Sequence, residues 1–296
     1  GRMWAAMSGV HDLPREKMWR RRDPTAFNGG ILRSDDSGKT WTTGRLEVGE
    51  AAVTHLLVDP DSPDDNRTLY ACAFGHGVLK STDGGKHWVR KNNGITQSNP
   101  LAWRIYQRTS DRTLFLILVR RSYDLPGGNE TDGAIYRSDD GAESWHPLPL
   151  PVGANGPTSL SVESVVDGTL LLSTWGRKST NPIHSDTAGG IFISQDDGRS
   201  WQAALEGDPH IYEITYDDRS RTHYACGFNA SAYLSTNNGH DWRRIEGYDF
   251  KWGKRVDIDP LNAALVYIST YGGGVWHGPA VASPPASTDQ PQPPAR

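Results

Sequence analysis

Short runs of β-branched and aromatic residues alternate with turns rich in glycine, proline and aspartate along most of the chain. Residues 53–58, 68–73 and 77–80 are three such runs. Residues 59–63 form the turn between the first two, because proline presets φ and aspartate accepts hydrogen bonds from the amides that follow. A fourth run begins at Trp88. This pattern predicts a unit of four short antiparallel strands.

An eight-residue sequence, Ser-Asp-Asp-Ser-Gly-Lys-Thr-Trp at residues 34–41, follows the third run of a unit and recurs along the chain. The other copies, which we call octets together with the first, occupy residues 81–88, 138–145, 194–201 and 235–242. Their tryptophans are roughly 40 to 60 residues apart, a spacing typical of blade arrays. One four-stranded sheet cannot bury both of its faces without neighbours. The sequence therefore predicts an all-β fold, a β-propeller of four-stranded antiparallel blades.

Each residue type in the octet has a mechanical role in a hairpin turn. The aspartate can accept amide hydrogens, the glycine supplies a positive φ, and the tryptophan covers the edge of the blade. The octets lack the alternating ligands and closing glutamate of a calcium loop. We therefore interpret the octet as a staple for a hairpin, and we predict no metal site and no cofactor.

The octet resembles the Asp-box, or BNR repeat, of sialidases, sortilin-type receptors, xyloglucanase-like glycoside hydrolases and photosystem assembly factors. Ala142 replaces the usual glycine in the third copy and Asn237 replaces the aspartate in the fifth. The sequence of one whole unit, residues 70–88, is most similar to sequences of the xyloglucanase-like glycoside hydrolases. The resemblance implies a propeller, but families with this repeat include enzymes, receptors and assembly factors.

The first strands of successive blades are expected near Val53, Ala102, Ser159, Tyr212 and Arg255. The first unit then lacks its innermost strand and the last lacks its outermost one. Six blades are visible, and we expect six or seven in the full protein, in a ring closed by a segment that precedes Gly1. We assign residues 1–280 to the propeller and residues 281–296, which are rich in proline, to a disordered tail.

The composition narrows the classes of partner and compartment. The net charge of −4 gives no electrostatic reason to expect nucleic acid as a partner, and no run of eighteen apolar residues suggests a membrane span. Cys72 and Cys226 occupy the same place in units three blades apart, too far for a disulfide, so we predict two free buried thiols. The Asp-box resemblance implies a secreted or periplasmic protein, with a signal peptide in the preceding segment.

Strand polarity places the connections from strand two to three and from strand four to the next strand one on the same face. The long loops belong to this face, which we call the long-loop face, and the octet turns lie opposite. Aromatic rings pack on sugar C–H faces, and charged groups bind hydroxyls, so the residue types on this face favour a polysaccharide or oligosaccharide. The predicted ligand-binding residues are Trp103, Arg104, Trp175, Arg177, Tyr212, Trp252 and Arg255. Trp103 and Trp252 have an alternative role in packing between blades.

Glycoside hydrolysis usually requires two carboxylates across a cleft. Glu213 is the best candidate on this face, because it lies in an innermost strand, and His11 and Asp12 stand where the first long loop begins. We therefore predict a glycoside hydrolase-like protein with Glu213, His11 and Asp12 as candidate catalytic residues. A polysaccharide lyase and a non-catalytic scaffold that docks a protein or peptide on the same face are the alternatives.

Overall fold

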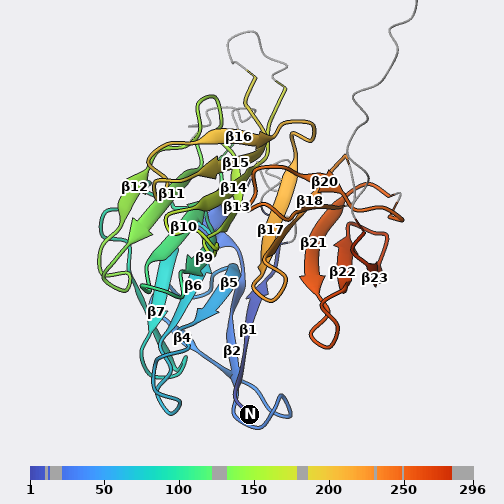
Figure 1. Ribbon diagram of the computed structural model, residues 1–296. Coiled ribbons are helices and arrows are strands. Elements are labelled where there is room, and N and C mark those ends of the chain that lie inside the picture. Colours follow the sequence, from blue (N-terminus) through green and yellow to red (C-terminus); the bar gives the residue numbers. More distant parts are fainter. Residues whose placement is uncertain are drawn as a thin grey trace, which may run out of the picture.

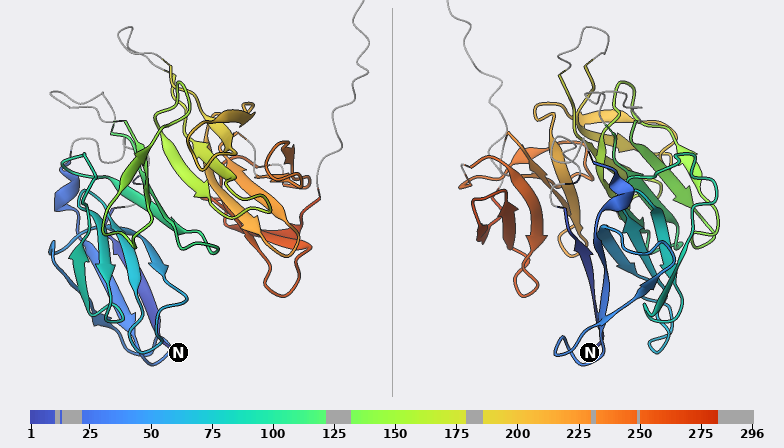
Figure 2. Two further views of the ribbon diagram at one scale, coloured as in Figure 1. Left: turned by 60° about the vertical axis from the view of Figure 1, so that its left-hand side comes forward. Right: turned by 180° about the vertical axis from the view of Figure 1, so that it is seen from behind.

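Six β-sheets follow one another along the chain in the computed structural model, which describes residues 1–10, 13, 22–121, 132–178, 186–229, 232–248 and 250–281. Figures 1 and 2 show the sheets fanned out in chain order, from the blue N-terminal sheet to the red C-terminal one. Apart from one short 3-10 helix, η2 (Pro24–Ala26), the named elements are strands. The predicted all-β propeller architecture is therefore confirmed.

We number the blades in chain order, and their strands pair as antiparallel neighbours. The first blade contains β1 (Met3–Ser8), β2 (Gly29–Ser34) and β3 (Thr42–Thr43), and the second contains β5 (Val53–Val58), β6 (Leu69–Ala73), β7 (Gly77–Ser81) and β8 (His87–Arg90). The third contains β9 (Ala102–Gln107), β10 (Leu114–Leu118), β11 (Ala134–Ser138) and β12 (His146–Leu148). The fourth contains β13 (Pro157–Ser161), β14 (Leu170–Thr174), β15 (Gly190–Ser194) and β16 (Gln202–Leu205). The fifth contains β17 (Ile211–Asp217), β18 (Thr222–Gly227), β19 (Ala232–Ser235) and β20 (Arg243–Arg244), and the sixth contains β21 (Gly253–Ile258), β22 (Leu265–Thr270) and β23 (Val275–Pro279).

In the second to sixth blades, the first strand is the innermost one. β5 contacts β9, β9 contacts β13, β13 contacts β17 and β17 contacts β21, so these strands form a continuous inner series. All five contain or begin at the positions predicted for strand one. The tail assigned to residues 281–296 lies outside the described residues except for its first residue.

One strand was not predicted. β4 (Arg45–Leu46) pairs in parallel with β8, so that the segment after the first octet extends the outer edge of the second blade. Its two residues are too few to give a strand pattern in the sequence. The added strand ties the first blade to the second through backbone hydrogen bonds from Arg45 and Glu47 to the 86 and 88 carbonyls.

The octets have one hydrogen-bond pattern in all five copies. The first serine accepts a hydrogen bond from the backbone N–H four residues later, at 2.8–3.0 Å, and the aspartate or asparagine accepts from the N–H of the octet's seventh residue. The fifth octet position has a positive φ in every copy, and Ala142 adopts this conformation with φ 70°. The predicted staple is thus built from groups inside the octet itself.

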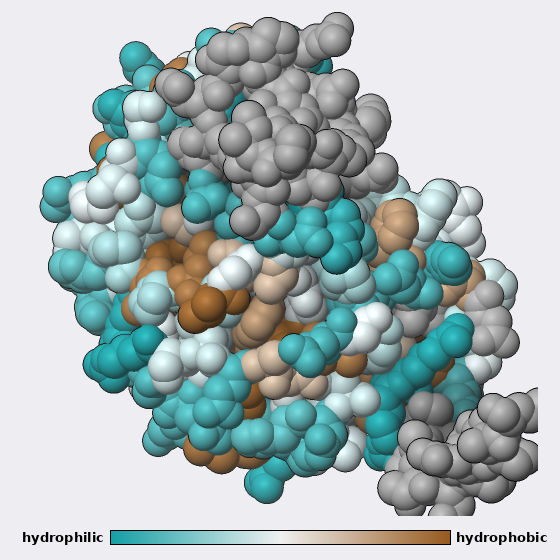
Figure 3. Space-filling model, turned by 90° about the horizontal axis from the view of Figure 1, so that it is seen from above, coloured by the Kyte–Doolittle hydropathy of each residue, from teal (hydrophilic) through white to brown (hydrophobic). Residues whose placement is uncertain are grey.

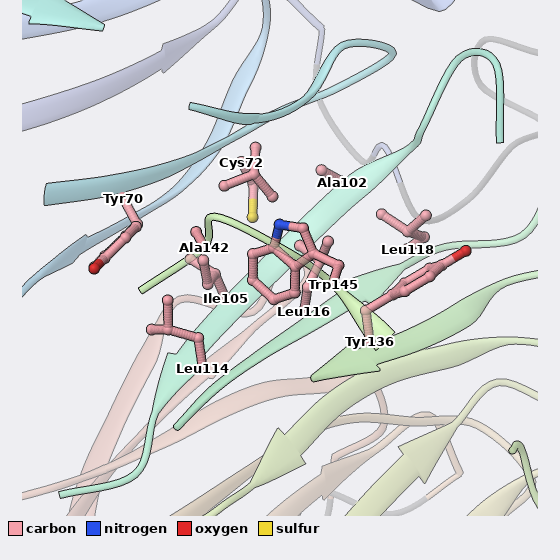
Figure 4. Close-up of a cluster of buried hydrophobic side chains, with 11 residues drawn as sticks. Tyr70, Cys72, Ala102, Ile105, Leu114, Leu116, Leu118, Tyr136, Ala142 and Trp145 are labelled. Carbon is pink, nitrogen blue, oxygen red and sulfur yellow. The ribbon is translucent and has the colours of Figure 1, made fainter. Parts of the chain in front are cut away.

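The core is a series of hydrophobic clusters between neighbouring blades. Strand two is its centre, since every residue of β6, β10, β14 and β18 is buried. Figure 4 shows the cluster between the second and third blades, with Trp145 in its middle. Cys72 lies in the same cluster, and Cys226 lies in the cluster between the fifth and sixth blades. Both cysteines are free and buried, as predicted.

Every inner strand has a register shift at the same place. The pairing with strand two skips one residue near the start of each of the five strands, which is a β-bulge. The skipped residues are Thr54, Trp103, Thr158, Tyr212 and Lys254. Because a bulge changes the direction of the side chains that follow, the next residues form an equivalent set around the centre of the propeller. Among the described residues, no helix is long and apolar enough to cross a membrane.

Candidate functional site

The residues that follow the five bulges are polar, and three of them are charged. They are His55, Arg104, Ser159, Glu213 and Arg255. Arg104 Nη2 lies 3.2 Å from Glu213 Oε2, and their side chains are 16% and 11% exposed. Arg255 Nε lies 3.6 Å from Glu213 Oε1 and 2.8 Å from Asp257 Oδ1. Glu213 on β17 therefore joins arginines from the third and sixth blades, and we call Arg104, Glu213, Arg255 and Asp257 the channel ion cluster.

The two neutral members of the set link the inner strands to each other. His55 Nδ1 accepts a hydrogen bond from the Ile105 amide at 3.4 Å, and Ser159 Oγ accepts from the Ile214 amide at 3.2 Å. Tyr106 also donates its hydroxyl hydrogen to Ser159 Oγ at 3.1 Å. Burial, followed by the charges of Arg104 and Arg255, lowers the pKa of His55 to about 3, so the imidazole is neutral at pH 7. These bonds hold neighbouring blades in register at the centre.

A cavity of about 590 Å³ lies beside the channel ion cluster. Its lining comes from four neighbouring inner strands and from Arg255 on the fifth. Thr109, Glu163 and Asp218, which belong to the turns from strand one to strand two, also line it. Those turns share a face with the octets, as the backbone bond from Gly84 to the Arg67 carbonyl shows. The cavity thus extends from the bulges toward the octet face.

A second cluster of candidate residues consists of aromatic side chains at the opposite ends of the strands. We call it the aromatic platform, and its members are Trp175, His210, Tyr212, Phe228, Trp252 and Tyr271. Trp175 lies 4.5 Å from the His210 ring and 4.6 Å from the Tyr212 ring, and Tyr271 lies 5.5 Å from Tyr212. Each member follows strand two, precedes strand one or begins strand one of its blade. Figure 3 looks onto this end of the molecule.

Trp252 is the exposed member of the platform. Its side chain is 46% exposed, and its ring stacks on Phe228 with centroids 5.4 Å apart and an interplanar angle of 28°. The backbone of Trp252 has φ 68°, a left-handed conformation that bulky residues seldom adopt. Its N–H donates to the Phe228 carbonyl and its carbonyl accepts from the Tyr271 N–H, both at 3.1 Å. The neighbouring loops therefore impose a strained conformation that keeps a large ring at the surface.

Asp208 bonds to the backbone of the loops that carry two members of the platform. It is fully buried, and its carboxylate accepts hydrogen bonds from the His210 and Asn229 amides at 3.1 and 3.0 Å. Burial lowers the pKa of His210, so this ring is neutral at pH 7. These hydrogen bonds give Asp208 a structural role in fixing the loops that carry His210 and Phe228.

The structure brings six of the predicted site residues together in two clusters. It brings Glu213, Arg104 and Arg255 together in the channel ion cluster, and Trp175, Tyr212 and Trp252 together in the aromatic platform. Trp103 packs between two interblade hydrophobic clusters, with the Arg104 guanidinium 4.9 Å from its ring centroid. Arg177 pairs through its backbone with Thr187, two residues beyond Trp175. His11 and Asp12 lie outside the described residues.

Several residues of both clusters were missed from the sequence. Phe228 and Tyr271 follow strand two in the fifth and sixth blades, where the loops are short, whereas the predicted face was defined by its long loops. Their shared position after strand two, which Trp175 also occupies, was the signal that could have found them. His55 and Asp257 were treated as strand residues only. Among the described residues, no group of three or more histidine, cysteine or acidic side chains is arranged to hold a metal ion.

Comparisons with known proteins place the fold. No family model matches the sequence. Over 174 residues, or 50% of this chain and 21% of that protein, the chain is 26% identical to a xyloglucanase of Hypocrea jecorina (strain QM6a). The chain therefore spans about a fifth of the length of this curated relative.

Solved structures of low sequence identity have the same architecture. An ancestral GH74 enzyme matches with a TM-score of 0.55 and 22% identity, over 74% of this chain and 27% of that one. YCF48 from Cyanidioschyzon merolae matches with a TM-score of 0.51 and 13% identity, over 79% and 68% of the two chains. A gluconolactonase from Xanthomonas campestris matches with a TM-score of 0.52 and 13% identity, over 84% of this chain and 82% of that one. These similarities support the β-propeller fold.

Proposed function

We propose that this protein is a secreted or periplasmic carbohydrate-directed propeller that binds a polysaccharide or oligosaccharide on its long-loop face. The aromatic platform supplies the surface on which sugar rings stack. Arg177, Lys254 and the loop amides beside it are polar partners for hydroxyl groups. The sequence similarity to a xyloglucanase supports a carbohydrate as the class of ligand.

The conformation of Trp252 is the observation that carries this proposal. Glycine adopts φ 68° with less strain than tryptophan does, and the indole keeps 46% of its surface exposed. Because the backbone conformation opposes tryptophan and nearly half of the ring is not used in packing, a ligand that stacks on the ring is the simplest reason for its presence. The stack beneath it, on Phe228, holds the ring in a fixed orientation.

A second candidate function is glycan hydrolysis at the channel ion cluster. It is favoured by the two carboxylates, Glu213 and Asp257, that converge on the same Arg255 nitrogen. Retaining glycosidases use two carboxyl groups close to each other, one as nucleophile and one as acid. In this mechanism Glu213 and Asp257 are the paired carboxyl groups, and His11 and Asp12 are the other candidate catalytic residues.

Affinity electrophoresis in gels with plant and algal polysaccharides tests the binding proposal. We expect Trp252→Ala to weaken binding about tenfold, or ~1.4 kcal/mol, because the stacking surface is lost. The matched control is Trp41→Ala, since Trp41 is 39% exposed and belongs to an octet on the opposite face. Equal binding by wild type and Trp252→Ala would contradict the proposed location of the site.

Reducing-sugar release from the same polysaccharides separates the functional classes. Turnover that disappears in Glu213→Gln supports a hydrolase, and unsaturated products that absorb in the ultraviolet support a lyase. Binding without turnover supports a lectin-like module. Absence of both, together with capture of a peptide or protein on the long-loop face, supports the scaffold function.

A further inference from the structure

The cavity beside the channel ion cluster is separate from the aromatic platform. None of the platform's six residues lines it, and its outer lining belongs to turns on the octet face. A volume of about 590 Å³ lies within the range of small-molecule sites, which is roughly 300–1,000 Å³. The cavity therefore has the size of a ligand site and faces away from the surface proposed for polysaccharide.

The inner end of the cavity offers hydrogen-bond donors. His55 uses Nδ1 as an acceptor for the Ile105 amide, so the neutral ring carries its proton on Nε2. Arg255 pairs with Glu213 and Asp257 through Nε, and because its side chain is 46% exposed, the guanidinium retains accessible N–H groups. Both residues line the cavity. A ligand here would meet at least two donors whose charge and tautomer are fixed by their neighbours.

The walls and the outer end have a different character. Leu57, Leu160 and Val162 provide apolar surface, and Thr215 provides a hydroxyl in the middle of β17. Glu163 and Asp218 place carboxylates toward the octet face, and Glu163 Oε1 already accepts from the Thr109 amide and hydroxyl. The cavity thus presents donors inside, acceptors outside and apolar contacts between them.

The charges around the cavity disfavour an anionic ligand. Three carboxylates, from Glu163, Glu213 and Asp218, line it together with one guanidinium, and His55 is neutral. A carboxylate or phosphate would have to approach past the acidic outer residues. Hydroxyl groups both donate and accept, so a compound rich in hydroxyls matches all three parts of the lining.

We propose that this cavity is a second binding site, open on the octet face, for a neutral polyhydroxylated ligand of mono- or disaccharide size. His55 and Arg255 donate to its inner hydroxyls, Thr215 bonds the middle and Glu163 accepts at the mouth. The site is independent of the aromatic platform, so it does not rest on the proposed polysaccharide binding.

Isothermal titration of the full chain with cellobiose, D-xylose and D-galacturonic acid tests the site. We expect cellobiose or xylose to bind and galacturonic acid to bind at least tenfold more weakly. Thr215→Phe places an aromatic ring in the middle of the cavity and should abolish binding. Thr215→Val keeps the shape and removes one hydrogen bond, and should weaken binding about fivefold. Trp252→Ala should leave the affinity for the small sugar unchanged, even though it weakens polysaccharide binding.

The outcomes decide between this site and the platform. Loss of small-sugar binding in Trp252→Ala, together with full binding in Thr215→Phe, would place the ligand on the platform and overturn the proposal. Preferential binding of galacturonic acid would overturn the charge argument. Absence of binding to all three probes by the wild-type protein would overturn the proposal as a whole. Thr215→Val provides the comparison if the phenylalanine variant does not fold.

Discussion

Glu213 compensates two positive charges that come from blades on either side of it. Arg104 reaches it from β9 and Arg255 from β21, and Glu213 and Arg104 are largely buried. Glu213→Gln keeps a hydrogen-bond acceptor for Arg104 but leaves the two guanidinium groups without their shared counter-charge. We expect the free energy of unfolding to fall by about 1–3 kcal/mol at pH 7, measured by urea denaturation.

Glu206→Gln is the matched control for this substitution. Glu206 is exposed at the end of the fourth blade and should change stability by less than about 0.5 kcal/mol. If the two variants are equally stable, the channel ion cluster contributes nothing to the fold, and a functional role for Glu213 becomes the remaining explanation for its position.

The backbone of Trp252 predicts an unusual order of stability among its variants. Glycine adopts φ 68° without strain, so Trp252→Gly should be more stable than Trp252→Ala by about 1 kcal/mol. Trp276 has the same 46% exposure but lies in strand β23. There the order should be reversed, with alanine more stable than glycine by roughly 0.5–1 kcal/mol. Thermal denaturation of the four variants measures both differences, and the same order at both positions would contradict the argument.

The residue types in the sequence predicted some members of each cluster, and the other members became apparent only from the structure. Glu213 stood out in the sequence because charged residues are rare in inner strands, and Arg104 and Arg255 stood out because guanidinium groups bind sugar hydroxyls. Their pairing could not be predicted, since it depends on how far side chains reach across β13, where Ser159 is small. His55 gave no signal, because a histidine inside an apolar run is usually a packed one.

At the level of the element, the octet is the most predictable part of the molecule. Its hydrogen bonds join groups that are at most four residues apart, so the sequence contains both partners of each bond. The bulges of the inner strands are the opposite case. They are stabilised by contacts between blades, for example from Thr158 Oγ1 to the Ile211 carbonyl at 2.7 Å. The five skipped residues are of four different types, so no single residue type marks a bulge.

The octet aspartates predict a loss of stability in acid. Hydrogen bonds from the hydroxyl and the amide of the seventh octet residue lower the pKa of Asp36, Asp140 and Asp196 from 3.8 to about 2. A folded-state pKa below the unfolded one stabilises the fold above the unfolded pKa, near pH 4, and this stabilisation is lost as the pH falls toward 2. Asn237 makes the same amide contact without titrating.

A triple variant, with asparagine at residues 36, 140 and 196, tests this reasoning. Its free energy of unfolding should depend less on pH than that of the wild type between pH 4 and 2, measured by urea denaturation at fixed ionic strength. The triple alanine variant should be less stable than the asparagine variant at every pH, because the turn amides lose their acceptor. Equal pH dependence of the wild type and the asparagine variant would show that the octets do not take part in acid unfolding.

At the scale of the whole molecule, the number and order of the blades followed from the octets and the inner strands. The separation of two candidate sites did not. The platform residues come from three successive blades and the cavity lining from five, so each site exists only after the blades are placed side by side. Strand polarity nevertheless predicted the face on which the platform residues gather, because it fixes where each loop emerges.

The arrangement of the blades also predicts a gradient of local stability. In a repeat architecture each unit is stabilised mainly by its neighbours, and local opening is easiest where few apolar contacts cover a strand. All residues of β18 are buried between the fourth and sixth blades, whereas β22, the equivalent strand of the sixth blade, alternates buried residues with partly or fully exposed ones, and β23 is largely exposed.

We expect amide hydrogens in β18 to exchange at least about tenfold more slowly than those in β22, measured by hydrogen–deuterium exchange with mass spectrometry. Strands β6, β10 and β14 should be as protected as β18, because their residues are also fully buried. Equal protection of β18 and β22 would mean that the blades open as one cooperative unit, and the stability of the inner ion cluster would then govern the whole ring.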